Sequence, residues 1–150
     1  MILTEQETML LNDLKQQEKL CMDKYEFYSK EAKDTELKQL FDRIKDDEQQ
    51  HHDTITKLLS GNTPDVGTAQ PPSYQPKASY NAADASEEKK HDALLCSDSI
   101  ASEKYVSSAY NSDLFSFASP KVRSILNHIQ TEEQQHAEMI YSYKTANAMA

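Results

Sequence analysis

The chain has 150 residues, a length typical of one domain and sufficient to bury a core. Its 25 acidic residues outnumber 16 Lys and Arg, and the resulting net charge of −9 argues against nucleic acid and anionic membranes as partners. No apolar run approaches the ~18 residues of a membrane helix, and no signal peptide is recognisable, so we expect synthesis in the cytoplasm.

Residues 1–59 are predicted to form a helical hairpin. Apolar residues recur there at alternating steps of three and four, which is typical of amphipathic helices. Asp34 is a plausible N-cap for the second helix and places a tight turn near that residue. The two stripes consist of Leu11, Leu14, Glu18, Cys21, Tyr25, Tyr28 and Ala32, and of Leu37, Phe41, Ile44, Glu48, His51, Ile55 and Leu58.

Residues 60–86 read as a polar linker. Both glycines and four of the five prolines fall between Gly61 and Pro76, and no periodic apolar pattern occurs. A connection of this length is unusual within a domain, yet one long crossover is characteristic of certain four-helix bundles. A mobile tether between two separable hairpins is the alternative. We favour the crossover because a lone hairpin would leave its apolar stripe exposed.

Residues 87–150 repeat the hairpin. Ser119 and Pro120 supply an N-cap and a proline at the first helical position of its second helix. The stripes here are Cys96, Ile100, Glu103, Val106, Tyr110, Leu114 and Phe117, then Val122, Ile125, Ile129, Glu133, His136, Ile140 and Tyr143. The sequence therefore predicts an all-α fold, with residues 1–150 as a single four-helix domain built from a duplicated hairpin.

The two hairpins superimpose at a constant shift of 85 residues without a gap. The polar residues inside the stripes are all repeated, whereas identities elsewhere are few. The repeated pairs include Glu18/Glu103, Tyr25/Tyr110, Ile44/Ile129, Glu48/Glu133, His51/His136 and Ile55/Ile140.

Six ionisable residues occupy core positions of the stripes and are predicted to share one height. Glu18 lies 16 residues before the turn at Asp34, while Glu48 and His51 lie 14 and 17 residues after it. The second hairpin repeats these offsets around Ser119. The six residues are Glu18, Glu48, His51, Glu103, Glu133 and His136.

Glutamate and histidine three residues apart lie on one helical face and can approach one ion together. Four carboxylates and two imidazoles suit two divalent ions such as iron, manganese or zinc. Any single position is better explained as a solvated or satisfied helix residue. Four unpaired carboxylates buried at one height would be strongly unfavourable, so the duplicated set favours a metal site.

This ligand pattern resembles that of ferritin-like di-iron carboxylate bundles, and the resemblance covers about 1–59 and 87–146. Tyr25 and Tyr110 each follow a glutamate by seven residues, as in rubrerythrin-like members, which suggests a supporting role beside the ligands. The resemblance implies a ferritin-like bundle with two metal ions, iron first, with manganese and zinc as alternatives.

A narrower resemblance, strongest over 93–146, is to the Coat F family of bacterial spore coat proteins. It is carried by Asp98-Ser-Ile-Ala-Ser-Glu-Lys-Tyr105, Ser108-Ala-Tyr-Asn111, Ser119-Pro-Lys-Val-Arg123 and Ile129-Gln-Thr-Glu-Glu-Gln-Gln-His136. This resemblance implies a structural or protective role in the spore coat, with other coat proteins or further copies of the chain as partners.

Two further functions stay open. One is a di-iron or di-manganese oxidase or peroxidase, although no rubredoxin-like cysteine pairs accompany the bundle and catalytic residues are unknown. The other is a metal-free helical interaction module. The remaining candidates have plainer readings. Cys21 is read as a small buried hydrophobe and not a reactive thiol, and Tyr74 and Tyr80 as contacts to the bundle surface and not cross-linking sites. Histidines placed outside the ligand set are His52, His91 and His128.

Overall fold

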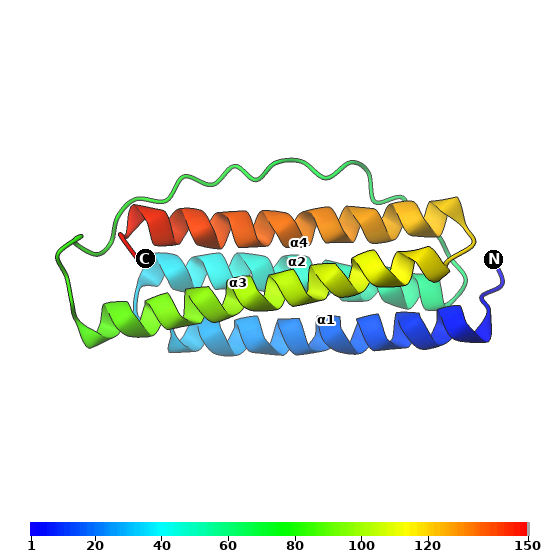
Figure 1. Ribbon diagram of the computed structural model, residues 1–150, viewed down its shortest axis with the longest axis horizontal. Helices are drawn as coiled ribbons and strands as arrows, with labels where there is room; N and C mark the ends of the chain where they lie inside the picture. The colour runs from blue at the N-terminus through cyan, green and yellow to red at the C-terminus, as the bar shows by residue number, and fades with distance from the viewer. Residues whose placement is uncertain (150) are drawn as a thin grey trace.

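Four long α-helices form in the order that the apolar stripes predict (Figure 1). They are α1 (Glu5–Glu31), α2 (Thr35–Leu59), α3 (Glu87–Asp113) and α4 (Pro120–Ala146), with a short 3₁₀ helix, η1 (Leu114–Ser116), after α3. The computed structural model describes residues 1–149, which contain no strand; residue 150, the end of the predicted second hairpin, lies outside them. None of these helices is both long and apolar enough to cross a membrane. That residues 1–150 fold as one domain stays a prediction.

The helix ends are set mainly by local capping. Thr4 and Glu7 form a capping box at the start of α1, in which each side chain accepts a hydrogen bond from the other residue's backbone N–H. Ser119 caps α4 with its side chain, as predicted, and Pro120 follows it. Asp34 is the N-cap residue of α2, as predicted, although its side chain makes no capping hydrogen bond. Its carboxylate instead accepts a hydrogen bond of 2.6 Å from the Tyr143 hydroxyl.

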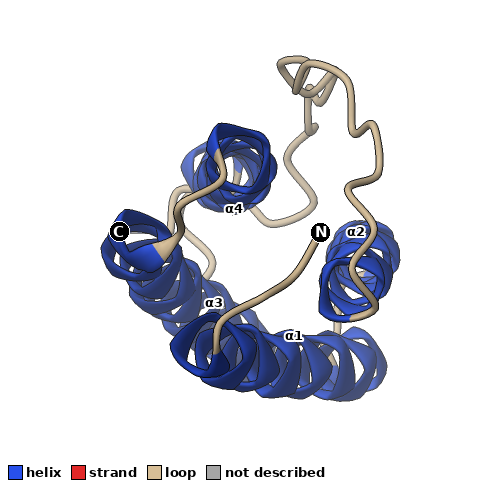
Figure 2. Ribbon diagram, turned by 90° about the vertical axis from the view of Figure 1, so that its right-hand side faces the viewer, coloured by secondary structure: helices blue, strands red, loops and turns tan. Residues whose placement is uncertain are grey.

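The helices pack as two antiparallel hairpins, α1 with α2 and α3 with α4, which close around a shared core (Figure 2). The core contains two apolar clusters separated along the bundle axis by the predicted polar layer. Both hairpins contribute to both clusters. The first includes Leu14, Ile55, Val106 and Ile129, and the second includes Tyr25, Phe41, Cys96 and Ile140.

The linker between α2 and α3 runs the length of the bundle over the α2 and α4 side (Figures 1 and 2). It begins at Gly61, whose φ of +87° favours glycine, and an added Cβ would lie 3.0 Å from the Met1 carbonyl oxygen. Val66 packs against the first apolar cluster, and Tyr74 and Tyr80 pack against the second. The linker is therefore a docked crossover, and its two tyrosines contact the bundle as predicted.

A cluster of hydrogen-bonded polar residues holds the linker and the α1–α2 turn at one end of the bundle. Asp92, fully buried, accepts hydrogen bonds from the Lys33 and Asp34 backbone N–H groups and from the Tyr80 hydroxyl, at 2.7–2.9 Å. Asn147 accepts from the Tyr80 backbone N–H at 2.9 Å. We call Asp34, Tyr80, Asp92, Tyr143 and Asn147 the end cluster.

Candidate metal centre

The six ionisable residues predicted to share one height do converge in the middle of the bundle, and we call them the central layer. All four helices contribute, and every member is 3% exposed or less. The apolar clusters lie on either side of the layer. The members are Glu18 on α1, Glu48 and His51 on α2, Glu103 on α3, and Glu133 and His136 on α4.

The central layer divides into two overlapping groups of potential ligands. Each group offers three carboxylate oxygens and one imidazole nitrogen, all within 4.8 Å of one another. Glu48 and Glu133 belong to both groups. The shift of 85 residues converts one group into the other. The groups are Glu18, Glu48, His51 and Glu133, and Glu48, Glu103, Glu133 and His136.

Both imidazole rings turn Nδ1 toward the carboxylates. Nδ1 of His51 lies 3.0 Å from Glu133 and 3.7 Å from both Glu18 and Glu48. Nδ1 of His136 lies 2.9 Å from Glu48, although without hydrogen-bonding geometry, and the rings stack with centroids 5.8 Å apart. The nitrogen that faces the layer is thus the same in both halves.

The two tyrosines predicted to support the layer do contact its carboxylates, across the two hairpins. The Tyr25 hydroxyl donates to Glu103, and the Tyr110 hydroxyl donates to Glu18, each at 2.6 Å. Burial and the neighbouring carboxylates raise the pKa of both tyrosines well above the usual range. Each phenol is therefore a donor that orients a glutamate of the other hairpin.

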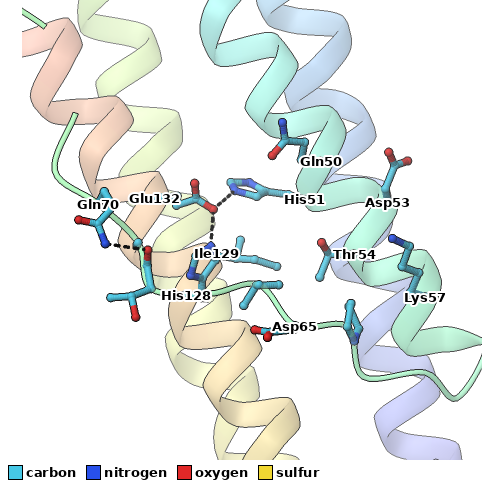
Figure 3. Close-up of a pocket in the computed structure, with 14 residues that line it drawn as sticks. Gln50, His51, Asp53, Thr54, Lys57, Asp65, Gln70, His128, Ile129 and Glu132 are labelled. Carbon is cyan, nitrogen blue, oxygen red and sulfur yellow. Dashed lines mark hydrogen bonds and ion pairs between the residues drawn. The ribbon is translucent and has the colours of Figure 1, made fainter. Parts of the chain in front are cut away.

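A second pair of carboxylates holds the outer nitrogens of the histidines, and the sequence-based prediction missed it. Nε2 of His51 lies 3.2 Å from Glu132, and Nε2 of His136 lies 3.0 Å from Asp47 (Figure 3 shows the first contact). Asp47 and Glu132 are themselves related by the 85-residue shift and each precedes a glutamate of the layer. A carboxylate at the outer nitrogen fixes the ring and leaves Nδ1 to act as a ligand.

Much of the central layer lacks hydrogen-bond partners. Buried polar groups in proteins are normally hydrogen-bonded, so such a concentration calls for an explanation. Because these atoms face one another, divalent cations between them would satisfy them together. The buried, unpartnered atoms of the layer are Glu18 Oε2, both oxygens of Glu48, Glu103 Oε2, Glu133 Oε2 and His136 Nδ1.

Burial and the crowding of charge raise the pKa of several groups in the layer. Burial and the nearby Glu48 raise the pKa of Glu18 to about 8. Burial, Glu103 and Glu48 raise the pKa of Glu133 well above its usual range. Burial alone would lower the pKa of His51, but its contacts with Glu132 and Glu133 raise it well above the usual value. Cations that bind here would compete with protons for these groups.

The remaining candidates lie outside the central layer. Cys21 is buried among apolar residues, and burial and the nearby glutamates raise its pKa, as expected of an unreactive thiol. His91 contacts the Glu31 carbonyl oxygen at 3.0 Å. The sequence predicts that His128 lies outside the ligand set. It belongs to neither ligand group, but its Nε2 lies 2.9 Å from Glu132 and so touches the carboxylate that holds His51.

Comparison with known proteins supports the resemblance in the second hairpin. Residues 91–149 match the Coat F domain, a stretch that takes in most of α3, all of η1 and α4, and less than half of the chain. The first hairpin, where the resemblance is weaker, falls outside the match. The searches of curated proteins and of solved structures found no match.

Proposed function

We propose that this chain is a spore-coat-associated protein whose bundle holds two divalent transition-metal ions in the central layer. The coat assignment rests on the Coat F domain match in the second hairpin. The metal assignment rests chiefly on one observation, the buried and unpartnered ligand atoms that face one another across four helices. Together they favour a structural or protective role, with other coat proteins or further copies of the chain as partners.

The residues present fit the proposed ions. Glu18 and His51 would hold one ion and Glu103 and His136 the other, while Glu48 and Glu133, which belong to both groups, would be available to either ion. Oxygen and imidazole donors suit iron, manganese or zinc, and four carboxylates balance the charge of two divalent cations. This set resembles that of ferritin-like di-iron carboxylate bundles, and we take iron as the first candidate.

Bound ions would stabilise the bundle. They would neutralise carboxylates whose mutual repulsion and burial otherwise oppose folding. Binding to the folded state alone raises stability by mass action. Tyr25 and Tyr110 would keep Glu103 and Glu18 oriented, while Asp47 and Glu132 would keep each Nδ1 facing inward. The chain's own residues thus pre-organise both halves of the site.

A second candidate function, a di-iron or di-manganese oxidase or peroxidase, is favoured by an opening between α3 and α4. This opening, of about 290 Å³, reaches Glu103 and Glu133, and Ser107, Ser108 and Ala137 also line it. The first-hairpin counterparts of these three small residues are the larger Met22, Asp23 and His52. When bound, redox-active ions would supply electron transfer to a small oxidant that enters there.

Metal content tests the proposal directly. The full chain, loaded separately with Fe(II), Mn(II) and Zn(II) and freed of excess ion, should retain up to two ions and melt at a higher temperature. Glu48→Ala combined with Glu133→Ala should abolish retention. The matched control, Asp46→Ala with Glu138→Ala, removes exposed carboxylates from the same two helices and should retain the metal.

The outcomes separate the candidates. Elemental analysis that finds no ion in the loaded wild-type protein would refute the metal site and leave a metal-free interaction module. Retention without any rise in melting temperature would mean that the ions are not structural. Oxygen consumption during Fe(II) loading, sustained beyond one turnover, would favour the oxidase over the scaffold.

A further inference from the structure

A cavity of about 440 Å³ lies between α2 and α4 beneath linker residues 64–70, and we call it the linker cavity (Figure 3). Val66 anchors its roof by packing on the first apolar cluster. Asp65 shapes the roof by accepting a hydrogen bond of 3.0 Å from the backbone N–H of Gly67, whose φ is +68°. His51, His128 and Glu132 line its inner wall.

His51, a member of the central layer, also lines the linker cavity. Nε2 of His51 contacts Glu132 on the cavity side, while Nδ1 faces Glu133 inside the layer. The side chain of Glu132 is 28% exposed and also contacts His128. Potential metal-ligand atoms therefore lie in succession from the partly exposed Glu132, through His51, to Glu133 in the buried layer.

The charges around the cavity suit cations. Asp53, Asp65 and Glu132 line it together with one ammonium group, that of Lys57. A cleft lined by an excess of carboxylates raises the local concentration of cations. At the opening between α3 and α4, apart from the layer's own Glu103 and Glu133, the one charged side chain is that of Lys104, which repels cations.

The two repeats differ at the residues that line the linker cavity. The second-hairpin counterparts of His51 and Thr54 are His136 and Met139, so a larger apolar side chain replaces a cavity-lining threonine. The counterpart of His128 is Arg43, which is not a metal ligand. The layer is nearly symmetric, but its connection to this cavity is not.

We infer that divalent metal ions reach the central layer through the linker cavity, where Glu132 and His128 receive them before they pass His51. This inference rests on the proposed metal function and adds the route by which the site fills. It assigns His128 a role in uptake and not in the final coordination. It also gives the docked linker a function, since residues within 64–70 line the route.

The rate of Zn(II) uptake by the metal-free full chain tests the route, measured by stopped-flow competition with a chromophoric chelator. Thr54→Met fills the cavity with the residue that its counterpart already carries, and His128→Gln removes the receiving ligand. Each should slow uptake by about tenfold or more while the final amount of bound Zn(II) stays unchanged. Ser107→Met, which narrows the opening between α3 and α4 with the side chain of its own counterpart, Met22, should leave the rate unchanged.

Equilibrium dialysis against Zn(II) distinguishes failure of the route from failure of the site. A wild-type protein that binds no Zn(II) would overturn the metal site and the route with it. Full binding with wild-type uptake rates in both Thr54→Met and His128→Gln would overturn the route alone. Slower uptake in Ser107→Met, with Thr54→Met unaffected, would also overturn it and assign uptake to the opening between α3 and α4.

Discussion

The central layer and the end cluster are both buried and polar, but they differ in how their polar atoms are satisfied. In the end cluster, both carboxylate oxygens of Asp92 accept hydrogen bonds, and Asn147 both donates and accepts. In the central layer, both oxygens of Glu48 and one oxygen each of Glu18, Glu103 and Glu133 have no partner. The end cluster is satisfied by the protein's own groups, whereas these oxygens of the central layer receive no hydrogen bond from the protein.

This difference separates two reasons for burying charge. A carboxylate whose oxygens accept several hydrogen bonds joins segments that are distant in the sequence, as Asp92 joins the α1–α2 turn to α3 and the linker. A group of facing carboxylates without hydrogen-bond donors opposes folding unless protons or cations neutralise their charge. We therefore expect changes in the two regions to respond differently to metal and to pH.

Removing Asp92 should have the largest effect on stability. Asp92→Ala leaves two backbone N–H groups and the Tyr80 hydroxyl without their acceptor, and should lower the free energy of unfolding by about 4 kcal/mol. Urea denaturation would measure the change, which should be the same with and without metal. As a control, Asp98→Ala removes a half-exposed aspartate from the same helix and should cost about 0.5 kcal/mol. Equal losses in the two variants would contradict the structural role of the end cluster.

The pH dependence of stability should reverse when metal binds. The pKa of Glu18 is raised to about 8 in the folded protein, so its contribution is fully present at low pH and is lost as the pH rises toward 8. The raised pKa values of Glu133 and the two histidines act in the same direction. Each such group changes stability by about 1.4 kcal/mol per pH unit. Glu18 alone should therefore lower the stability of metal-free protein by on the order of 2 to 3 kcal/mol between pH 5.5 and 7.5.

With metal present, stability should instead rise over the same range, because the ions compete with protons for the same atoms. Thermal melts in chelator and in Mn(II), at matched ionic strength, would measure both slopes. Slopes of the same sign in the two conditions would argue against cations and protons sharing the central layer.

The smallest effect comes from a matched pair of tyrosines. Tyr143→Phe and Tyr110→Phe each remove a hydroxyl that donates to a carboxylate at 2.6 Å, in the end cluster and in the central layer respectively. Each should cost about 1 kcal/mol in metal-free protein. Only Tyr110→Phe should also weaken metal binding, by about tenfold, because its hydroxyl orients Glu18. Calorimetric titration with Zn(II) would measure the affinities. Equal affinities in the two variants would show that the Tyr110 hydroxyl does not support metal binding.

Much of the fold follows from local patterns. Steps of three and four identify each helix, while capping residues and proline mark where helices start, so Ser119 and Pro120 were correctly placed. The predicted linker, residues 60–86, fills the interval between α2 and α3. The predicted stripe ends at Phe117, beyond the end of α3 at Asp113, where η1 begins. The stripe continues into η1 because a 3₁₀ turn has nearly the same periodicity as an α-helix.

The convergence of the central layer was also predictable, because equal distances from two turns imply equal heights in antiparallel helices. Only some of the residues that support the layer could be predicted from the sequence. Tyr25 and Tyr110 repeat as identical residues, but Asp47 and Glu132 repeat as an Asp/Glu pair on partly exposed positions, where carboxylates are common. A comparison that accepted either acid at the 85-residue shift would have found them.

The sequence by itself therefore determined the helices, the starts of α2 and α4, the duplication and the height at which the ionisable residues meet. Those properties depend on residues close in the chain or on a simple count from a turn. Tertiary structure alone decided that Asp34 turns to Tyr143, that Asp92 is satisfied while Glu48 is not, and that the linker roofs a cavity beside His51. Hydrogen-bond satisfaction and access depend on which distant segments come together, and no periodic pattern records that.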